Sequence, residues 1–222
     1  MSPAELALSP QAANIHIKRP ALALFDFDGT LTHNDNYSAF LHFATPRWRL
    51  ALLAPLLYTL KGAWQLGWLS SAYTRRWVTR LCYSGRRQQT LVQLGKRYMA
   101  QHQSHIFRPE MLARLRWHQQ RGDHIALVSA SLDLYLTPWA QEQKITLLCS
   151  ELAYRHGIAT GGYRHGDCAN QYKAQRIQQH FQLEDYGSIY AYGDTAEDHA
   201  MLALAHHPYL NNQPWHPNTS PR

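Results

Sequence analysis

An apolar run that ends in two carboxylates is the feature that most constrains this chain, because residues 21–32 read ALALFDFDGTLT. The apolar part is typical of a buried strand, and the Asp-Gly-Thr that follows is typical of a turn. Side chains of a strand alternate between its faces, so a continued strand would place Asp26 and Asp28 on one side. Two close carboxylates repel each other unless a cation or a shared proton intervenes. The pattern predicts half of a metal site, although an Asp-Gly pair that merely closes a turn is the simpler alternative.

A second strand-like run, residues 124–130 (HIALVSA), contains Ser129 near its end and precedes a helix-compatible stretch from about Leu132. A hydroxyl and free backbone N–H groups at the start of a helix form a binding site for phosphate. Ser129 is therefore a candidate phosphate ligand, and Ser131 is placed to share that role. Either serine would equally serve as an ordinary N-cap or turn residue.

Charged side chains recur in two later segments. Residues 170–181 (NQYKAQRIQQHF) have the apolar spacing of a short helix, and Lys173 falls in its first turn, where a cation opposes the helix dipole. That mild penalty indicates a task such as holding a phosphate, although a solvated lysine gives the same pattern. In residues 188–204 a third strand-like run is followed by Asp194 and then by Asp198. The helix dipole alone would favour Asp198, whereas Asp194 stands directly after a strand and is harder to explain without a function.

The order of strand-like and helical stretches predicts an α/β domain with a largely parallel sheet. The chain has 222 residues, of which 45% are hydrophobic, and this supplies a core for one domain with an insertion. Active sites of such sheets lie at the carboxyl ends of the strands, where the polar residues above fall. The glycine-rich residues 151–166 predict a small antiparallel hairpin. The expected strands are near residues 21–27, 124–129, 145–149 and 188–192.

Four motifs in this order, DFDGTLT, LVSAS, NQYKAQ and GDTAED, resemble the haloacid dehalogenase-like hydrolases, and specifically the phosphoserine phosphatase-like subgroup (subfamily IB). The resemblance covers about residues 20–210 and implies a Rossmann-like core with an inserted all-helical cap. We expect the core at 19–35 and 110–211 and the cap at 36–109. We also expect a poorly ordered N-terminus at 1–18 and a poorly ordered tail at 212–222.

The resemblance also implies how phosphoryl transfer is divided among the residues. It makes Asp26 the nucleophile that forms an aspartyl-phosphate, and Asp28 the general acid and base. It makes Thr30, Ser129 and Lys173 the phosphate-binding group, with Thr30 bracing the loop. Attack of a carboxylate on a phosphate dianion requires neighbouring positive charge, which fits Lys173 and a metal ion.

The same resemblance implies a Mg²⁺ cofactor. Asp194 would bind the ion together with Asp26 and the backbone carbonyl of Asp28, and Asp198 would order a metal-bound water or a neighbouring ligand. Mg²⁺ prefers a few carboxylates together with phosphate oxygens and waters, which suits this set.

The predicted cap has an unusual charge. Residues 36–109 contain eleven Lys or Arg, no Asp or Glu, and four of the seven Trp. A solvated basic surface around an ordinary helical core is the simplest explanation. The others are steering of anionic phosphoesters, and peripheral contact with an anionic membrane through residues 47–68. The apolar run 50–60 is shorter than the ~20 residues that a bilayer needs, and nucleic-acid binding is disfavoured because no recognised motif accompanies the charge.

We therefore expect a Mg²⁺-dependent phosphomonoester phosphatase. Asp35 lies where similar phosphoserine phosphatases carry an acid that contacts the substrate's amino group, which indicates a small amine-bearing phosphomonoester. An alternative is that Asp35 caps a helix. Thr195 and Glu197 depart from the fourth motif of the phosphoserine enzymes, so other substrates, including a lipid phosphate such as phosphatidylglycerophosphate, stay open. A phosphotransferase using the same intermediate stays open too.

Cysteine usage favours a cytoplasmic protein, with membrane association as the alternative. Cys82, Cys149 and Cys168 are odd in number and widely spaced, which supports neither a disulfide framework nor a zinc site. The N-terminus lacks the basic and apolar regions of a secretory signal. The sequence leaves the oligomeric state open.

Overall fold

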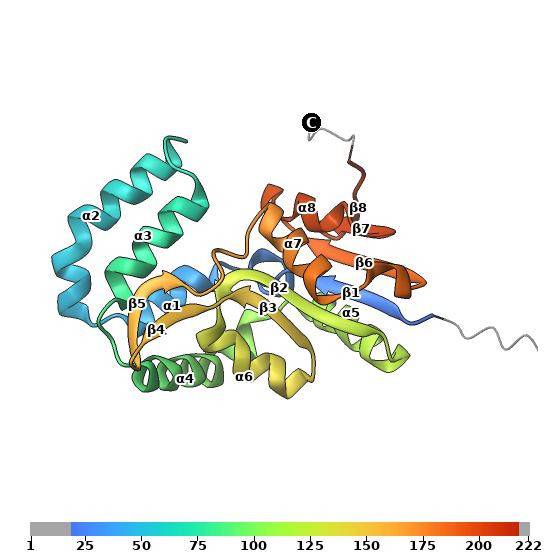
Figure 1. The fold of residues 1–222 in the computed structure, drawn as a ribbon, viewed down its shortest axis with the longest axis horizontal. Helices are drawn as coiled ribbons and strands as arrows, with labels where there is room; N and C mark the ends of the chain where they lie inside the picture. Colours follow the sequence, from blue (N-terminus) through green and yellow to red (C-terminus); the bar gives the residue numbers. More distant parts are fainter. Residues whose placement is uncertain (1–18, 218–222) are drawn as a thin grey trace, which may run out of the picture.

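The computed structural model describes residues 19–217 and has a central β-sheet with helices packed against it (Figure 1). This confirms the predicted α/β fold with a mostly parallel sheet. The strands are β1 (Ala21–Phe25), β2 (His124–Leu132), β3 (Thr146–Ser150), β4 (Leu152–Arg155), β5 (Ile158–Tyr163), β6 (Ser188–Gly193), β7 (His207–Leu210) and β8 (Gln213–Pro214). The helices are α1 (Asn36–Ala44), α2 (Arg47–Gln65), α3 (Ser71–Tyr83), α4 (Gln88–Ile106), α5 (Pro109–Arg121), α6 (Asp133–Gln143), α7 (Gln171–His180) and α8 (His199–Leu202).

The main sheet has the strand order β3-β2-β1-β6-β7-β8, and its pairs are parallel except for β7 with β8. All four predicted strands lie in this sheet. The chain moves outward from β1 through β2 to β3 on one side, and through β6 to β7 on the other. The carboxyl end of β1 is therefore the point where the strand order reverses, which is where open α/β sheets bind ligands.

Strand β1 is apolar throughout because helices cover both of its faces. Ala23 and Phe25 belong to one buried cluster, and Leu22 and Leu24 belong to the other. None of these four side chains is exposed, so β1 is anchored from both sides. The loop that follows β1 therefore starts from a rigid support.

Helices α1 to α4 fill the stretch that was predicted as a helical cap. The structure adds a feature to this region: the predicted hairpin forms as the antiparallel pair β4–β5, and it packs on α3. Gly161 of β5 lies so close to α3 that an added Cβ would be 2.7 Å from the Arg80 Cα atom. The hairpin thus joins the helical insertion although it was expected as part of the core, at 110–211. Figure 1 shows α2 at the outer edge, beside α3.

The predicted tail needs a correction. Residues 212–217 are part of the fold, because Gln213–Pro214 forms β8 and Trp215 is buried against the second cluster. Strands β7 and β8 were missed since their short segments contain His, Pro and Asn instead of an apolar run. The predicted disorder of 1–18 and the last part of the tail, 218–222, lie outside the described residues.

Candidate functional site

Three acidic residues from the ends of β1 and β6 meet at the centre of the sheet. Asp26 directly follows β1, Asp194 directly follows β6, and Asp198 lies at the end of a short helical turn. One carboxylate oxygen of each lies within 4.8 Å of the others. Carboxylate oxygens are the donors that Mg²⁺ prefers, so the residues present fit this ion. The predicted pair of Asp26 and Asp194 is thus brought together.

Lys173 contacts two of these acids. It stands in the first turn of α7, is 2% exposed, and its Nζ lies 2.5 Å from Asp26 Oδ1 and 2.6 Å from Asp198 Oδ1. Burial would lower the pKa of Lys173, but the two carboxylates outweigh it and raise the pKa. The lysine is therefore a buried cation aimed at the acids and not the solvated residue that its position alone would suggest.

Burial and charge act differently on the two acids that contact Lys173. Burial raises the pKa of Asp26 well above its ordinary value, and Lys173 offsets this only in part. Burial also acts to raise the pKa of Asp198, but Lys173 lowers it overall, with help from the backbone N–H groups of Asp194 and Thr195. Asp198 is thus held as an anion that orients Lys173 and the loop carrying Asp194.

Asp28 points away from the acidic cluster. The strand ends at Phe25, so its alternation does not continue to Asp28, and the two acids take different partners. The Asn36 N–H donates to Asp28 Oδ1 at 2.7 Å, and the Ser131 hydroxyl donates to Oδ2. Burial raises the pKa of Asp28 to about 6, against the opposite effect of the Ser131 hydrogen bond. A carboxyl group with this pKa can give and take a proton near neutral pH.

Gly29 lets the first and last motifs approach each other. Its φ is +76°, and an added Cβ would lie 2.1 Å from Asp194 Oδ2, so only glycine fits here. Thr30 Oγ1 donates to Asp194 Oδ1 at 3.4 Å, and burial raises the pKa of Asp194 to about 6. Thr30 therefore braces the loop, as predicted, through a contact with Asp194.

Ser129 is buried near the carboxyl end of β2. Its Oγ accepts a hydrogen bond from the Ser131 N–H at 3.1 Å, and this turn directs the Ser131 hydroxyl to Asp28. Strand β2 runs on to Leu132, so Ser129 lies before the start of α6 and not at its N-cap. The phosphate-binding role of Ser129 stays a prediction.

Asp35 is the N-cap of α1, where its side chain accepts from the Ser38 N–H at 3.1 Å. This is the alternative that the sequence left open, and Asp35 is exposed to solvent. The hydrogen bond gives Asp35 a structural role, and its contact with a substrate amino group stays a prediction.

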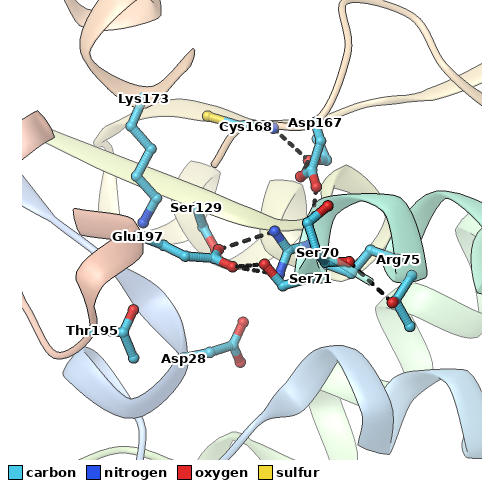
Figure 2. A network of polar contacts seen from close by, with 12 residues as sticks. Asp28, Ser70, Ser71, Arg75, Ser129, Asp167, Cys168, Lys173, Thr195 and Glu197 are labelled. Carbon is cyan, nitrogen blue, oxygen red and sulfur yellow. Dashed lines mark hydrogen bonds and ion pairs between the residues drawn. The ribbon is translucent and has the colours of Figure 1, made fainter. Parts of the chain in front are cut away.

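An ion-pair network that the sequence did not reveal joins α3 to the core (Figure 2). The Arg75 guanidinium lies 2.9 Å from Glu197 and 3.0 Å from Asp167, and the Ser71 hydroxyl also donates to Glu197. Glu197 is the residue that departs from the fourth motif of the phosphoserine enzymes. The paired charge in α3 explains an acid at this position, and only the fold brings the partners together.

A model of the haloacid dehalogenase-like hydrolase family matches residues 23–203 of the chain, which include all four motifs. The chain belongs to the haloacid dehalogenase-like hydrolases. This confirms the family resemblance and the expectation of an enzyme of the hydrolase class. A relative, protein CicA from Caulobacter vibrioides, is 31% identical over 198 residues, covering 84% of this chain and 83% of its own length.

Solved structures share the fold and agree with the phosphoserine phosphatase-like subgroup. A protein of unknown function from Bordetella pertussis superposes with a TM-score of 0.73 at 22% identity, covering 86% of this chain and 89% of its own. A substrate-bound phosphoserine phosphatase superposes with a TM-score of 0.61 at 18% identity, covering 85% of this chain and 84% of its own.

Proposed function

We propose that the chain is a Mg²⁺-dependent phosphomonoester phosphatase that works through an aspartyl-phosphate on Asp26. The observation that carries the proposal is the convergence of Asp26, Asp194 and Asp198 with the buried ammonium of Lys173. Mg²⁺ held by Asp26, Asp194 and the backbone carbonyl of Asp28 would supply positive charge that neutralises the phosphate oxygens.

The chain's own residues divide the reaction into two steps. A carboxylate oxygen of Asp26 attacks phosphorus, and the bond between phosphorus and the leaving oxygen breaks. Asp28 in its protonated form gives its proton to that leaving oxygen. Asp28, now a carboxylate, then takes a proton from the water that attacks the aspartyl-phosphate, which releases phosphate and restores Asp26. Lys173 stabilises the charge that develops on the phosphoryl oxygens in both steps.

The hydrogen bonds around Asp28 support its role as the acid and base. Asn36 begins α1, so a residue of the helical insertion orients the carboxyl group. A second partner comes from Ser131 at the end of β2. Proton transfer thereby depends on the placement of the insertion over the sheet, and this links binding of the leaving group to catalysis.

For the substrate we propose a small-metabolite or amine-bearing phosphomonoester in a cytoplasmic enzyme. A second candidate is a lipid phosphate at a membrane surface. The exposed apolar face of α2, taken up below, favours this second candidate. A phosphotransferase would use the same aspartyl-phosphate but pass it to an alcohol instead of water.

The test is phosphate release from a panel of phosphomonoesters by the wild-type protein and by Asp26→Asn. Release should require Mg²⁺, stop with EDTA and return when Mg²⁺ is restored in excess. Asp26→Asn should abolish release while keeping the wild-type fold by circular dichroism. Activity that survives this substitution would exclude Asp26 as nucleophile. Adding a high concentration of glycerol separates the two reactions, because a phosphotransferase forms glycerol phosphate at the expense of free phosphate.

A further inference from the structure

Helix α2 contributes no buried residue to the protein although it is 19 residues long. Large apolar side chains on this helix and on the loop after it are between 45% and 77% exposed. We call them, together with Arg47 and Lys61, the α2 surface. The apolar members are Trp48, Leu52, Leu56, Tyr58, Trp64, Leu66 and Trp68. The four Trp of the insertion are all at least 41% exposed, so they do not form its core, contrary to the simplest explanation of the sequence.

The exposed apolar residues of α2 follow helical spacing. Trp48, Leu52 and Leu56 are four residues apart and share one stripe of the helix. Leu50 and Leu57 lie on another side and pack against the main core. The helix therefore has two apolar sides, and the protein itself covers one of them. A contiguous apolar surface of this kind indicates a binding partner.

A basic stripe borders the apolar one. Arg47, Tyr58 and Lys61 share a face at helical spacing, and both charged residues are exposed. The absence of any acid in 36–109 means that this whole region attracts anions and has no carboxylate to repel them. Exposed Trp and Leu beside Lys and Arg are typical of helices that lie in the plane of a membrane interface.

We propose that the α2 surface docks the protein on an anionic phospholipid bilayer. The apolar stripe would enter the boundary between headgroups and acyl chains, and Arg47 and Lys61 would remain among the phosphates. Within residues 19–217, no helix is both long and apolar enough to cross a bilayer. The contact is therefore with the surface of the membrane, and charge complementarity selects anionic lipids over neutral ones.

The α2 surface continues into the rim of the candidate site. Leu66 and Trp68 lie in the loop that leads to α3, and Ser71 at the start of α3 donates a hydrogen bond to Glu197. Glu197 is three residues after Asp194. A phosphomonoester at the bilayer surface would thus be close in the chain to the residues that act on it. This consequence for the substrate rests on the proposed phosphatase function, whereas docking itself does not.

The test is flotation of the full-length protein with vesicles of phosphatidylcholine, alone or mixed with phosphatidylglycerol. We expect co-flotation with the anionic vesicles at low salt, weak co-flotation with neutral vesicles, and release at high salt. Asp26→Asn should bind as the wild type does, so loss of the phosphatase assignment would leave the docking result intact.

Two variants assign the binding to the α2 surface. Trp48→Ser/Leu52→Ser/Leu56→Ser removes the apolar stripe and should weaken vesicle partitioning at least about tenfold. Arg47→Gln/Lys61→Gln removes two charges and should weaken it about thirtyfold, from roughly fivefold for each basic residue at an anionic surface. Both should keep the wild-type circular dichroism spectrum.

A charge-matched control comes from two exposed basic residues outside the insertion. Arg116→Gln/Lys144→Gln removes the same charge from α5 and from the end of α6, and it should change partitioning less than about threefold. Equal losses in both charge variants would overturn the proposal, because the attraction would then be general. Failure of the wild type to float with anionic vesicles at low salt would overturn it too. Tight binding to an oligonucleotide without binding to vesicles would contradict it in favour of nucleic acid.

Discussion

The Nζ atom of Lys173 lies 2.5 Å from Oδ1 of Asp26, although the two residues are 147 positions apart in the sequence. The same Nζ lies 2.6 Å from Asp198, so one ammonium group separates two buried carboxylates. Lys173→Met would leave these acids facing each other. We expect it to cost about 3–5 kcal/mol of stability without metal, as for other broken buried ion pairs. Phosphatase activity should fall at least about a hundredfold.

Thermal unfolding with and without Mg²⁺ checks this prediction. Added Mg²⁺ should recover part of the lost stability, because it supplies positive charge next to the same acids, but it should not recover activity. An equally active Lys173→Met protein would show that the lysine only holds the fold.

Asp28→Asn should reveal itself through the leaving group. Alkyl phosphates need a proton on the leaving oxygen, so we expect a loss of about 10²- to 10⁴-fold with them. The loss should be much smaller with p-nitrophenyl phosphate, whose leaving group needs no acid. Comparison of kcat/KM for the two ester types measures the difference, and equal losses for both would argue against proton transfer by Asp28.

The pH dependence of stability should reflect the metal cluster. Burial raises the pKa of Asp194 from 3.8 to about 6. The folded state then binds more protons than the unfolded state between about pH 4 and 6, so this group makes the free energy of unfolding fall as pH rises through that window. Mg²⁺ competes with the protons, so it should raise the melting temperature more near neutral pH than at about pH 5. Asp194→Asn should weaken both effects, measured by thermal melts across pH.

Arg75→Gln should loosen the attachment of α3 to the core. It would leave Asp167 and Glu197 without their shared cation, at a cost of about 2 kcal/mol after allowing for partial exposure. Hydrogen exchange should become faster in α3 but stay unchanged in β1. Arg76→Gln is the matched control, because Arg76 is exposed on the same helix. Identical exchange in both variants would contradict a role for the Arg75 network.

Two glycines of the helical insertion should respond oppositely to alanine. In Gly95→Ala the added Cβ would lie 1.9 Å from the Leu134 carbonyl oxygen, so α4 and α6 would have to separate, and we expect a loss of at least about 2 kcal/mol. In α2, Gly62 has open space around it, and Gly62→Ala should stabilise by up to about 1 kcal/mol through helix propensity. Denaturant unfolding of both variants measures the contrast.

The sequence by itself determined the class of the fold and the residues at the strand ends. Strand β1 is a continuous apolar run because both its faces are covered, and Asp26 and Asp194 stand where parallel strands must end together. These are local patterns, and the period of a strand is enough to read them. Lys173 and Ser129 were also selected by their place in the chain.

Only the tertiary structure decided which of these side chains touch. Asp28 was expected beside Asp26, but the strand stops at Phe25 and Asp28 turns to Asn36 and Ser131. The pairing of Arg75 with Glu197 and the outward stripe of α2 were likewise invisible in the sequence. Contacts between residues far apart in the chain depend on how helices and sheet pack, and neither composition nor local periodicity carries that information.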